Sequence, residues 1–436
     1  MPSFLIDIHG CPKAVYDSEI IAAKLFESDY DFREENEKRD YTIIFTCGFL
    51  KASRKESEKA IKKALENPEK NGKIIVAGCY TQLYHEELKK KYPEVFLFIG
   101  VNEFDKLPEL IEKRENLVSK NTKGEFDFTG KAILTGQYWD YLKISEGCSH
   151  KCSFCIIPKI RGQYRSRELD SIKSELEMLE SIGIKEINIV SQDSSYYGID
   201  RGSSELVNLL DIVEKEYDFE WIRVLYLNPM HLSDEIIERI GEGKVLPYFD
   251  IPFQHSSEKI LKLMKRGGSG REFLKIIEKI RKNHPDAFIR TSLITGFPGE
   301  GEKEFNELEN FVKSAEIEHL GVFSYSDEPL SDSYYLSCKN NEKLAIERKE
   351  KIYEIQNELF NKRLGEPLNK KFDAIFEYED NDYLYLRLWF QAPEGIDGFA
   401  YLEKSEIKTL EEIPPIIKVN TINYDFEING FNVELL

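Results

Sequence analysis

The stretch EGCSHKCSFCIIPKIRG, at residues 146–162, holds Cys148, Cys152 and Cys155 within eight residues, whereas the whole chain of 436 residues has seven cysteines. A disulfide would leave one of the three thiols over. The chain opens on MPSFLIDIHG, which has neither a basic leader nor an apolar run of signal length. We therefore expect a cytoplasmic protein whose thiols stay reduced, and in such proteins clustered cysteines bind metal or serve catalysis.

Length and charge narrow the class of protein. The length predicts about three domains, and no stretch approaches the roughly 18 apolar residues that span a bilayer. The formal charge is −19 at pH 7. A protein that coats nucleic acid needs basic surface, because phosphate contacts dominate its affinity. The charge therefore favours a partner that is small or basic, and we expect no membrane partner.

The segments around the cysteine loop predict an α/β protein. Residues 132–366 read as six strand–helix units in series, the first strand being YLKISEG directly before the cysteines. Such a series predicts a parallel sheet curled into a partial (βα)6 barrel. In barrels of this kind the chemistry lies at the carboxyl ends of the strands. The segments SEGC, SQDSS, LNPM, PFQHSS and TGFPGE fall at those ends.

Two smaller domains flank the predicted barrel. Residues 1–114 alternate short β-branched runs with charged helical stretches, which predicts a small α/β domain. Residues 115–131 have many turn formers and no periodicity, so we expect a linker there. Residues 367–436 contain short strands broken by turns, which is typical of a small all-β barrel.

Three close cysteines fit two kinds of metal site. A closed structural zinc site needs four ligands, and His150, the nearest candidate for the fourth, lies between two of the cysteines where its reach is poor. A four-iron, four-sulfur cluster accepts three thiolates and leaves its fourth iron open to bind a further ligand. The spacing alone favours the cluster and leaves zinc as the alternative.

The pattern Cys-x3-Cys-x2-Cys, with the aromatic Phe154 before its last cysteine and its place after the first barrel strand, resembles the radical S-adenosylmethionine enzymes. The resemblance implies that the open iron chelates S-adenosylmethionine. In the chemistry that the resemblance implies, a reduced cluster donates one electron to the sulfonium of S-adenosylmethionine. The bond between sulfur and the 5′-carbon then breaks, which gives methionine and a 5′-deoxyadenosyl radical that abstracts hydrogen from an unactivated carbon. It also implies that Phe154 packs near the adenine and that Gly296, in TGFPGE, lets the cofactor approach the backbone. An ordinary strand-to-helix turn would explain the glycine equally well.

Polar residues on or near the predicted strands are further candidates for binding the polar groups of the cofactor. They are Glu186, Gln192, Gln254 and Arg290. A buried polar network is the alternative explanation for all four. Lys159 and Arg161 are candidates to meet carboxylates of the substrate or cofactor, and the alternative is that both lie in solvent.

Three further cysteines, Cys11, Cys47 and Cys79, lie far apart in sequence, but each follows a short predicted strand and has a glycine beside it. Buried structural thiols are the alternative here, because free cysteine often packs as a small apolar residue. Their equivalent positions favour a second cluster with an open iron. We assign no role to Cys338, which lies in the polar segment LSCKNN.

This arrangement resembles the methylthiotransferases over essentially the whole chain. Proteins of that family carry an amino-terminal domain with three such cysteines, a radical barrel and a small β barrel called TRAM. The resemblance implies two 4Fe-4S clusters, S-adenosylmethionine used both as methyl donor and as radical source, and an unidentified electron donor. The segments GCPK, SQDSSYYGID and YFDIPFQHSS are similar to the RimO branch. That branch methylthiolates the β-carbon of an aspartate in ribosomal protein S-twelve. Methylthiolation of an adenosine in transfer RNA is the alternative.

Charge supports the protein substrate. From residue 371 onwards the chain has 14 acidic and 5 basic residues, which argues against direct RNA binding by the TRAM domain and suits a basic ribosomal protein. The chain departs from the RimO pattern at Ala14 and Phe45, where asparagine is usual, and at SDEPLSDSYY. None of these positions is a cysteine.

Overall fold

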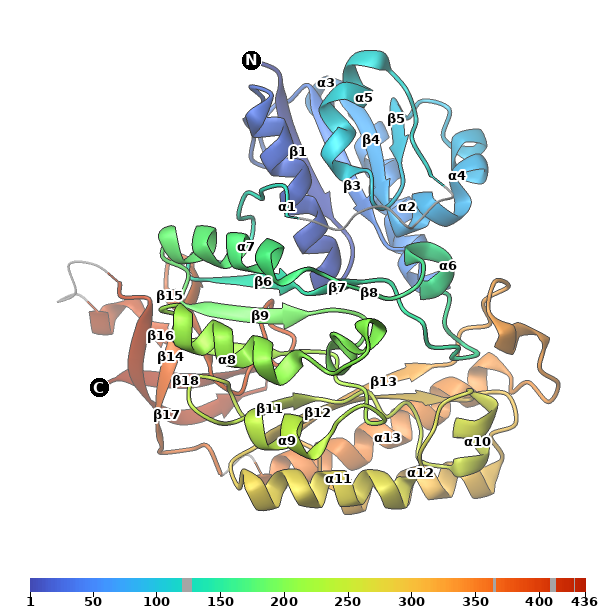
Figure 1. Ribbon diagram of the computed structural model, residues 1–436, viewed down its shortest axis with the longest axis vertical. Coiled ribbons are helices and arrows are strands. Elements are labelled where there is room, and N and C mark those ends of the chain that lie inside the picture. Colours follow the sequence, from blue (N-terminus) through green and yellow to red (C-terminus); the bar gives the residue numbers. More distant parts are fainter. Residues whose placement is uncertain (120–127, 364–365, 408–412, 427) are drawn as a thin grey trace.

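The computed structural model describes residues 1–119, 128–363, 366–407, 413–426 and 428–436. Three domains follow one another along the chain (Figure 1), which confirms the predicted α/β class with a partial barrel and a terminal β barrel. Within the described ranges, no helix has the length and apolar character needed to cross a bilayer.

The amino-terminal domain is a parallel sheet of five strands in the order β2-β1-β3-β4-β5. The strands are β1 (Ser3–Ile8), β2 (Asp31–Phe32), β3 (Tyr41–Thr46), β4 (Lys73–Gly78) and β5 (Leu97–Ile99). The helices are α1 (Pro12–Glu27), α2 (Lys51–Leu65), α3 (Pro68–Asn71), α4 (Cys79–Lys91) and α5 (Leu107–Lys113). The strands are apolar and β-branched because the sheet is covered on both faces, and their carboxyl ends share one edge.

The central domain consists of two three-stranded parallel sheets that together form the partial barrel, in the orders β10-β9-β6 and β11-β12-β13. The strands are β6 (Trp139–Lys143), β9 (Glu186–Val190), β10 (Trp221–Val224), β11 (Tyr248–Asp250), β12 (Phe288–Thr295) and β13 (His319–Ser324). A parallel bridge between Ile222 and Val245 joins the two sheets. A short antiparallel pair, β7 (Ser145–Glu146) with β8 (Arg165–Ser166), closes the base of the cysteine loop.

Amphipathic helices cover the outer side of the barrel (Figure 1). They are α7 (Leu169–Ser181), α8 (Leu206–Glu216), α9 (Asp234–Arg239), α10 (Glu258–Leu263), α11 (Gly270–Asn283), α12 (Glu302–Ala315) and α13 (Glu342–Arg363). The short helix α6 (Ile157–Arg161) follows the cysteine loop and packs against the amino-terminal domain. Side chains such as Leu176, Leu210 and Ile277 are almost fully buried against the strands. Each contributes about 1.5–3 kcal/mol through removal of apolar surface from water.

The terminal domain is a closed barrel of five strands in the order β14-β15-β16-β18-β17, consistent with a TRAM domain. The strands are β14 (Lys371–Glu379), β15 (Tyr383–Leu388), β16 (Phe399–Glu403), β17 (Ile416–Asp425) and β18 (Gly430–Leu435). Closure leaves no strand edge unpaired, which removes the usual route to edge-to-edge aggregation.

The terminal barrel closes the amino-terminal mouth of the central barrel. Trp139 donates to Glu377 at 2.7 Å, and Tyr141 donates to Glu394, also at 2.7 Å. Tyr248 donates to Asp397 at 2.5 Å. The cysteine loop and α6 lie at the opposite end of the strands, beneath the amino-terminal domain (Figure 1). The terminal domain therefore covers the amino ends of the strands, and the cysteine loop lies at their carboxyl ends.

Candidate active site

Cys11, Cys47 and Cys79, the amino-terminal cysteines, lie at the carboxyl edge of the first sheet. Cys11 precedes α1, Cys47 follows β3, and Cys79 begins α4 directly after β4. Burial raises the pKa of the Cys79 thiol to about 11; Arg161 opposes this rise, and the neighbouring Cys47 and Cys11 thiols add to it. The structure thus brings together three thiols that lie 68 residues apart at their extremes.

Gly48 allows this close approach. A Cβ atom at Gly48 would lie 2.7 Å from the carbonyl oxygen of Cys79, which is closer than real side chains come to a backbone oxygen. A larger residue would push the Cys47 loop away from the start of α4. Glycine at this position therefore allows the loop that carries Cys47 to lie close to Cys79.

The barrel cysteines, Cys148, Cys152 and Cys155, lie in the loop between β7 and α6. The backbone of Cys148 donates to Gly162 at 3.1 Å, and that of Cys155 donates to Cys152 at 3.1 Å. Burial raises the pKa of Cys148 to about 11 and that of Cys155 to about 12, and in both cases neighbouring thiols of the loop add to the rise. These thiols therefore lie near enough to one another to interact electrostatically.

The two donor sets fit an iron–sulfur cluster better than a closed zinc site. Each set offers three free thiols. His150, the candidate for a fourth zinc ligand, is engaged elsewhere, because its Nε2 lies 2.6 Å from Oδ2 of Asp193. Burial raises the pKa of Asp193, but hydrogen bonds with His150, His231 and Ser195 outweigh it and hold that pKa below its ordinary value. Three thiolates without a fourth protein ligand match a cluster with one open iron.

Each cysteine set has one arginine against a sulfur. Nη2 of Arg161 lies 3.4 Å from Sγ of Cys79, and Nη1 of Arg266 lies 3.8 Å from Sγ of Cys152. Positive charge beside a thiolate stabilises the ionised form that binds iron. Arg266 was missed at the sequence level, because it lies 111 residues beyond the last cysteine of its loop and has no local motif.

Arg161 also joins the amino-terminal domain to the barrel. Its Nη1 lies 2.6 Å from Asp17 on α1 and 3.1 Å from Glu146 of the barrel. Lys143 pairs with the same two carboxylates. All four side chains are buried. The sequence predicted that Arg161 meets carboxylates of the substrate or cofactor; in the structure it pairs with two carboxylates of the chain itself.

Three of the predicted cofactor residues lie near the barrel cysteines or at the carboxyl ends of strands. Phe154 stands between two cysteines and packs against the barrel core. Gln192, just after β9, donates to Glu146 at 3.3 Å, and its buried Oε1 has no hydrogen-bond partner among the residues that the structure describes. Gln254, just after β11, has a left-handed backbone (φ +71°) held by a bond to Ser292. The free oxygen of Gln192 is an acceptor for a donor that arrives from outside.

Glu186 is a correction to the sequence-based expectation. It lies at the amino end of β9, far from the cysteine loop, and its carboxylate is shared between Arg387 of the TRAM domain and Arg223 of β10. All three side chains are fully buried. The alternative of a buried polar network is therefore the correct one, and Glu186 joins two domains.

Arg290 and Gly296 also have structural partners. Arg290, inside the barrel on β12, lies 3.0 Å from Asp250 and 3.4 Å from Asp397. Gly296 has φ +75°, and a Cβ atom there would lie 2.2 Å from that of Ala345 on α13. Helix packing accounts for this glycine, as the alternative of an ordinary turn had allowed.

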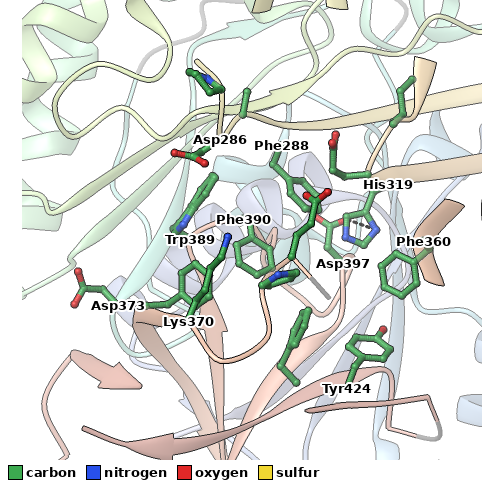
Figure 2. Close-up of a pocket in the computed structure, with 18 of the residues that line it drawn as sticks. Asp286, Phe288, His319, Phe360, Lys370, Asp373, Trp389, Phe390, Asp397 and Tyr424 are labelled. Carbon is green, nitrogen blue, oxygen red and sulfur yellow. Dashed lines mark ion pairs between the residues drawn. The ribbon is translucent and has the colours of Figure 1, made fainter. Parts of the chain in front are cut away.

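A cavity of about 620 Å³ lies away from the cysteines (Figure 2). It is lined by aromatic residues that include Phe288, Trp389 and Phe390, with His319 and Asp397 3.8 Å apart in its wall. Phe288 and His319 begin β12 and β13, so the cavity opens at the amino ends of the strands against the TRAM domain. Its lining includes no cysteine, and we do not assign it to the active site.

Comparison with known proteins places the chain in a family. Residues 142–312 match the radical SAM superfamily, and residues 3–100 match the uncharacterized protein family UPF0004. The ribosomal protein uS12 methylthiotransferase RimO of Thermosipho africanus is 41% identical over 402 residues, which cover 92% of this chain and 93% of the relative. The chain belongs to the RimO family.

A further RimO protein is similar to this chain over nearly its whole length. The protein of Aquifex aeolicus is 37% identical and covers 98% of this chain and 96% of its own length. Among solved structures, the radical S-adenosylmethionine methyltransferase TsrM of Kitasatospora setae, with cobalamin and a [4Fe-4S] cluster bound, gives a TM-score of 0.57 at 11% identity, over 76% of this chain and 77% of TsrM. That likeness supports the fold alone. The predicted family, fold class and enzyme class, a radical SAM methylthiotransferase, are confirmed.

Proposed function

We propose that this RimO-family enzyme attaches a methylthio group to the β-carbon of an aspartate in ribosomal protein uS12, in the cytoplasm, with two 4Fe-4S clusters and S-adenosylmethionine. The observation that carries the proposal is the pair of three-thiol sets at the junction of the first two domains, joined by Arg161. The relatives at 37–41% identity are named for this substrate.

The barrel cysteines would hold one cluster and the amino-terminal cysteines the other. When bound, the barrel cluster and S-adenosylmethionine would supply the radical that removes a hydrogen atom from the substrate carbon, and the amino-terminal cluster would supply the sulfur. Arg266 and Arg161 offset the negative charge that each set of thiolates brings into a buried site. Phe154 would pack against the adenine, while Gln192 and Gln254 offer polar groups at the strand ends.

The TRAM domain packs against the amino ends of the barrel strands, away from the cysteines, and we assign it a part in selecting the substrate. Its acidic residues attract a basic ribosomal protein through complementary potentials. The alternative substrate, an adenosine of transfer RNA, would call for a basic surface on this domain.

The test compares the two substrates directly. The full chain is reconstituted anaerobically with iron and sulfide, supplied with S-adenosylmethionine and a chemical reductant, and given either a uS12 peptide or transfer RNA. Mass spectrometry should find the methylthio group on the aspartate of the peptide and none on the RNA. Modification of the RNA with an unmodified peptide would overturn the proposal.

A further inference from the structure

Lys13 is a buried lysine that crosses from the amino-terminal domain into the mouth of the barrel. It lies in the first turn of α1, two residues after Cys11, and is 9% exposed. Its Nζ donates to the carbonyl oxygen of Ser191 at 3.1 Å and lies 3.6 Å from the centroid of the Tyr226 ring. Ser191 follows β9 and Tyr226 follows β10, so the ammonium group sits at the carboxyl ends of two barrel strands.

Each of the other buried cations of the described chain has a carboxylate partner or, in one case, several hydrogen bonds. Lys131 and Lys143 each lie within 4 Å of two or more carboxylates. Ion pairs with carboxylates also hold the buried arginines Arg161, Arg167, Arg223, Arg239, Arg348 and Arg387. Arg39 lacks a carboxylate but donates to five side-chain and carbonyl oxygens.

Lys13 is the exception within the described residues, because it takes part in no ion pair and only one hydrogen bond of its ammonium group. A lysine ammonium carries three N–H donors, so two remain for another acceptor. Burying a cation without a counter-charge costs several kcal/mol. Cys11, Glu146 and Asp250 act on this cation electrostatically, but none of them pairs with its ammonium group, so an anion from outside would complete the arrangement.

The surroundings of Lys13 also favour an anion. Helix α1 is 16 residues long, has no side-chain cap at its amino end and no acidic residue in its first turn. No side chain of the first turn therefore compensates the positive end of the helix dipole next to Lys13. Tyr226, beneath the ammonium, has a left-handed backbone (φ +61°), and its N–H donates to Asp250 at 3.0 Å. A non-glycine residue in this conformation persists only where neighbours hold it, so the floor of the site is rigid.

We propose that Lys13 binds the side-chain carboxylate of the substrate aspartate and is the residue that selects aspartate. The inference rests on the proposed function. In aspartate the β-carbon is bonded directly to the carboxylate carbon. When Lys13 holds the carboxylate, the reacting β-carbon is therefore only one bond from a fixed group. This places the β-carbon close to Cys11 and at the mouth of the barrel. Fixing the carbon there replaces a chance encounter by a bound geometry.

The expected discrimination follows from the charge. A hydrogen bond between charged groups is worth about 1.5–3 kcal/mol, which corresponds to about 10- to 100-fold in binding. An asparagine side chain has nearly the same shape but leaves the cation uncompensated. We therefore expect the wild-type enzyme to bind a uS12 peptide with aspartate about 10- to 100-fold more tightly than the same peptide with asparagine.

The test measures peptide binding by the reconstituted full chain without S-adenosylmethionine, by anaerobic fluorescence polarisation. Lys13→Met removes the charge and keeps the length of the side chain. It should weaken binding of the aspartate peptide to the level of the asparagine peptide and leave the latter unchanged. Lys13→Arg should keep a preference for aspartate. Lys63→Met, a change of an exposed lysine on α2, should behave as wild type.

Two outcomes would overturn the inference. Lys13→Met could retain the wild-type preference for the aspartate peptide. It could also weaken binding of both peptides equally, which is the result expected if Lys13 only holds the two domains together. A melting scan of each variant reports whether the fold is intact. If Lys13→Met does not fold, the inference is judged by whether Lys13→Arg keeps the preference for the aspartate peptide. If the wild-type enzyme binds the aspartate peptide selectively but never modifies it, the proposed function fails and the inference about Lys13 survives. If the wild-type enzyme modifies the aspartate peptide but binds it no more tightly than the asparagine peptide, the inference about Lys13 fails and the proposed function survives.

Discussion

Replacing Arg161 by methionine should loosen the contact between the amino-terminal domain and the barrel. The change removes one of two cations that compensate Asp17 and Glu146, both buried. Breaking a buried ion pair by removing one partner costs about 3–5 kcal/mol. Lys143 still contacts both carboxylates, so we take the low end of that range, about 3 kcal/mol.

Hydrogen–deuterium exchange of the metal-free protein measures this loss locally, because such opening need not involve the whole chain. A loss of about 3 kcal/mol should speed exchange of the protected amides of α1 by about 100-fold. The control is Arg33→Met, which removes a half-exposed pair with Asp31 at 3.5 Å and should change exchange by less than about fivefold. If Arg161→Met behaves like this control, the network does not hold the two domains together.

The same substitution should alter the acid limit of stability. Burial raises the pKa of Glu146, but Lys143 and Arg161 outweigh it and hold that pKa below the ordinary value of 4.5. A depressed pKa stabilises the fold above the unfolded value, and the contribution is lost as pH falls through the folded value. In Arg161→Met the folded pKa rises, so unfolding on acid titration should begin at a higher pH. An unchanged acid midpoint would contradict the assigned coupling.

The remaining predictions concern the two clusters and two structural residues. Alanine at all three barrel cysteines should abolish formation of 5′-deoxyadenosine and halve the bound iron and sulfide, and a persistent product would mean that the other set cleaves S-adenosylmethionine. Alanine at all three amino-terminal cysteines should leave that cleavage largely intact and abolish the methylthiolated peptide, so a modified peptide would show that these thiols are structural. Glu186→Gln should lower the melting temperature, since it leaves Arg223 and Arg387 with less compensation at a cost of about 3 kcal/mol. It should not change 5′-deoxyadenosine formation at a temperature where the variant is folded, and selective loss of that activity would restore a cofactor role for Glu186. Gly296→Ala should destabilise the protein by about 1–3 kcal/mol in denaturant titration, through its left-handed backbone and its clash with Ala345, and an unchanged midpoint would show that α13 moves aside.

Features that depend on residues close together in the sequence could be predicted without the structure. The spacing of the barrel cysteines is a local property, because a single loop must present three sulfurs to one metal group. The alternation of strands and helices follows from hydrophobic period and propensity, so the partial barrel and the small flanking domains could be predicted. The sequence could also predict that the amino-terminal cysteines lie near one another, because the carboxyl ends of parallel strands meet at one edge of a sheet.

Side-chain partners across domains depended on the tertiary structure. Glu186 has the sequence context of a strand residue at a ligand site, yet its position at the amino end of β9 brings it to Arg387, 201 residues away. Gly296 sits in a motif-like turn, but α13 explains it. Arg266 lies in no local motif, and the GCPK segment that contains Lys13 does not indicate where its ammonium group lies. Their roles arise from which neighbours surround a buried charge, and the energy of a buried charge is set by those neighbours and by the exclusion of water, neither of which a one-dimensional pattern contains.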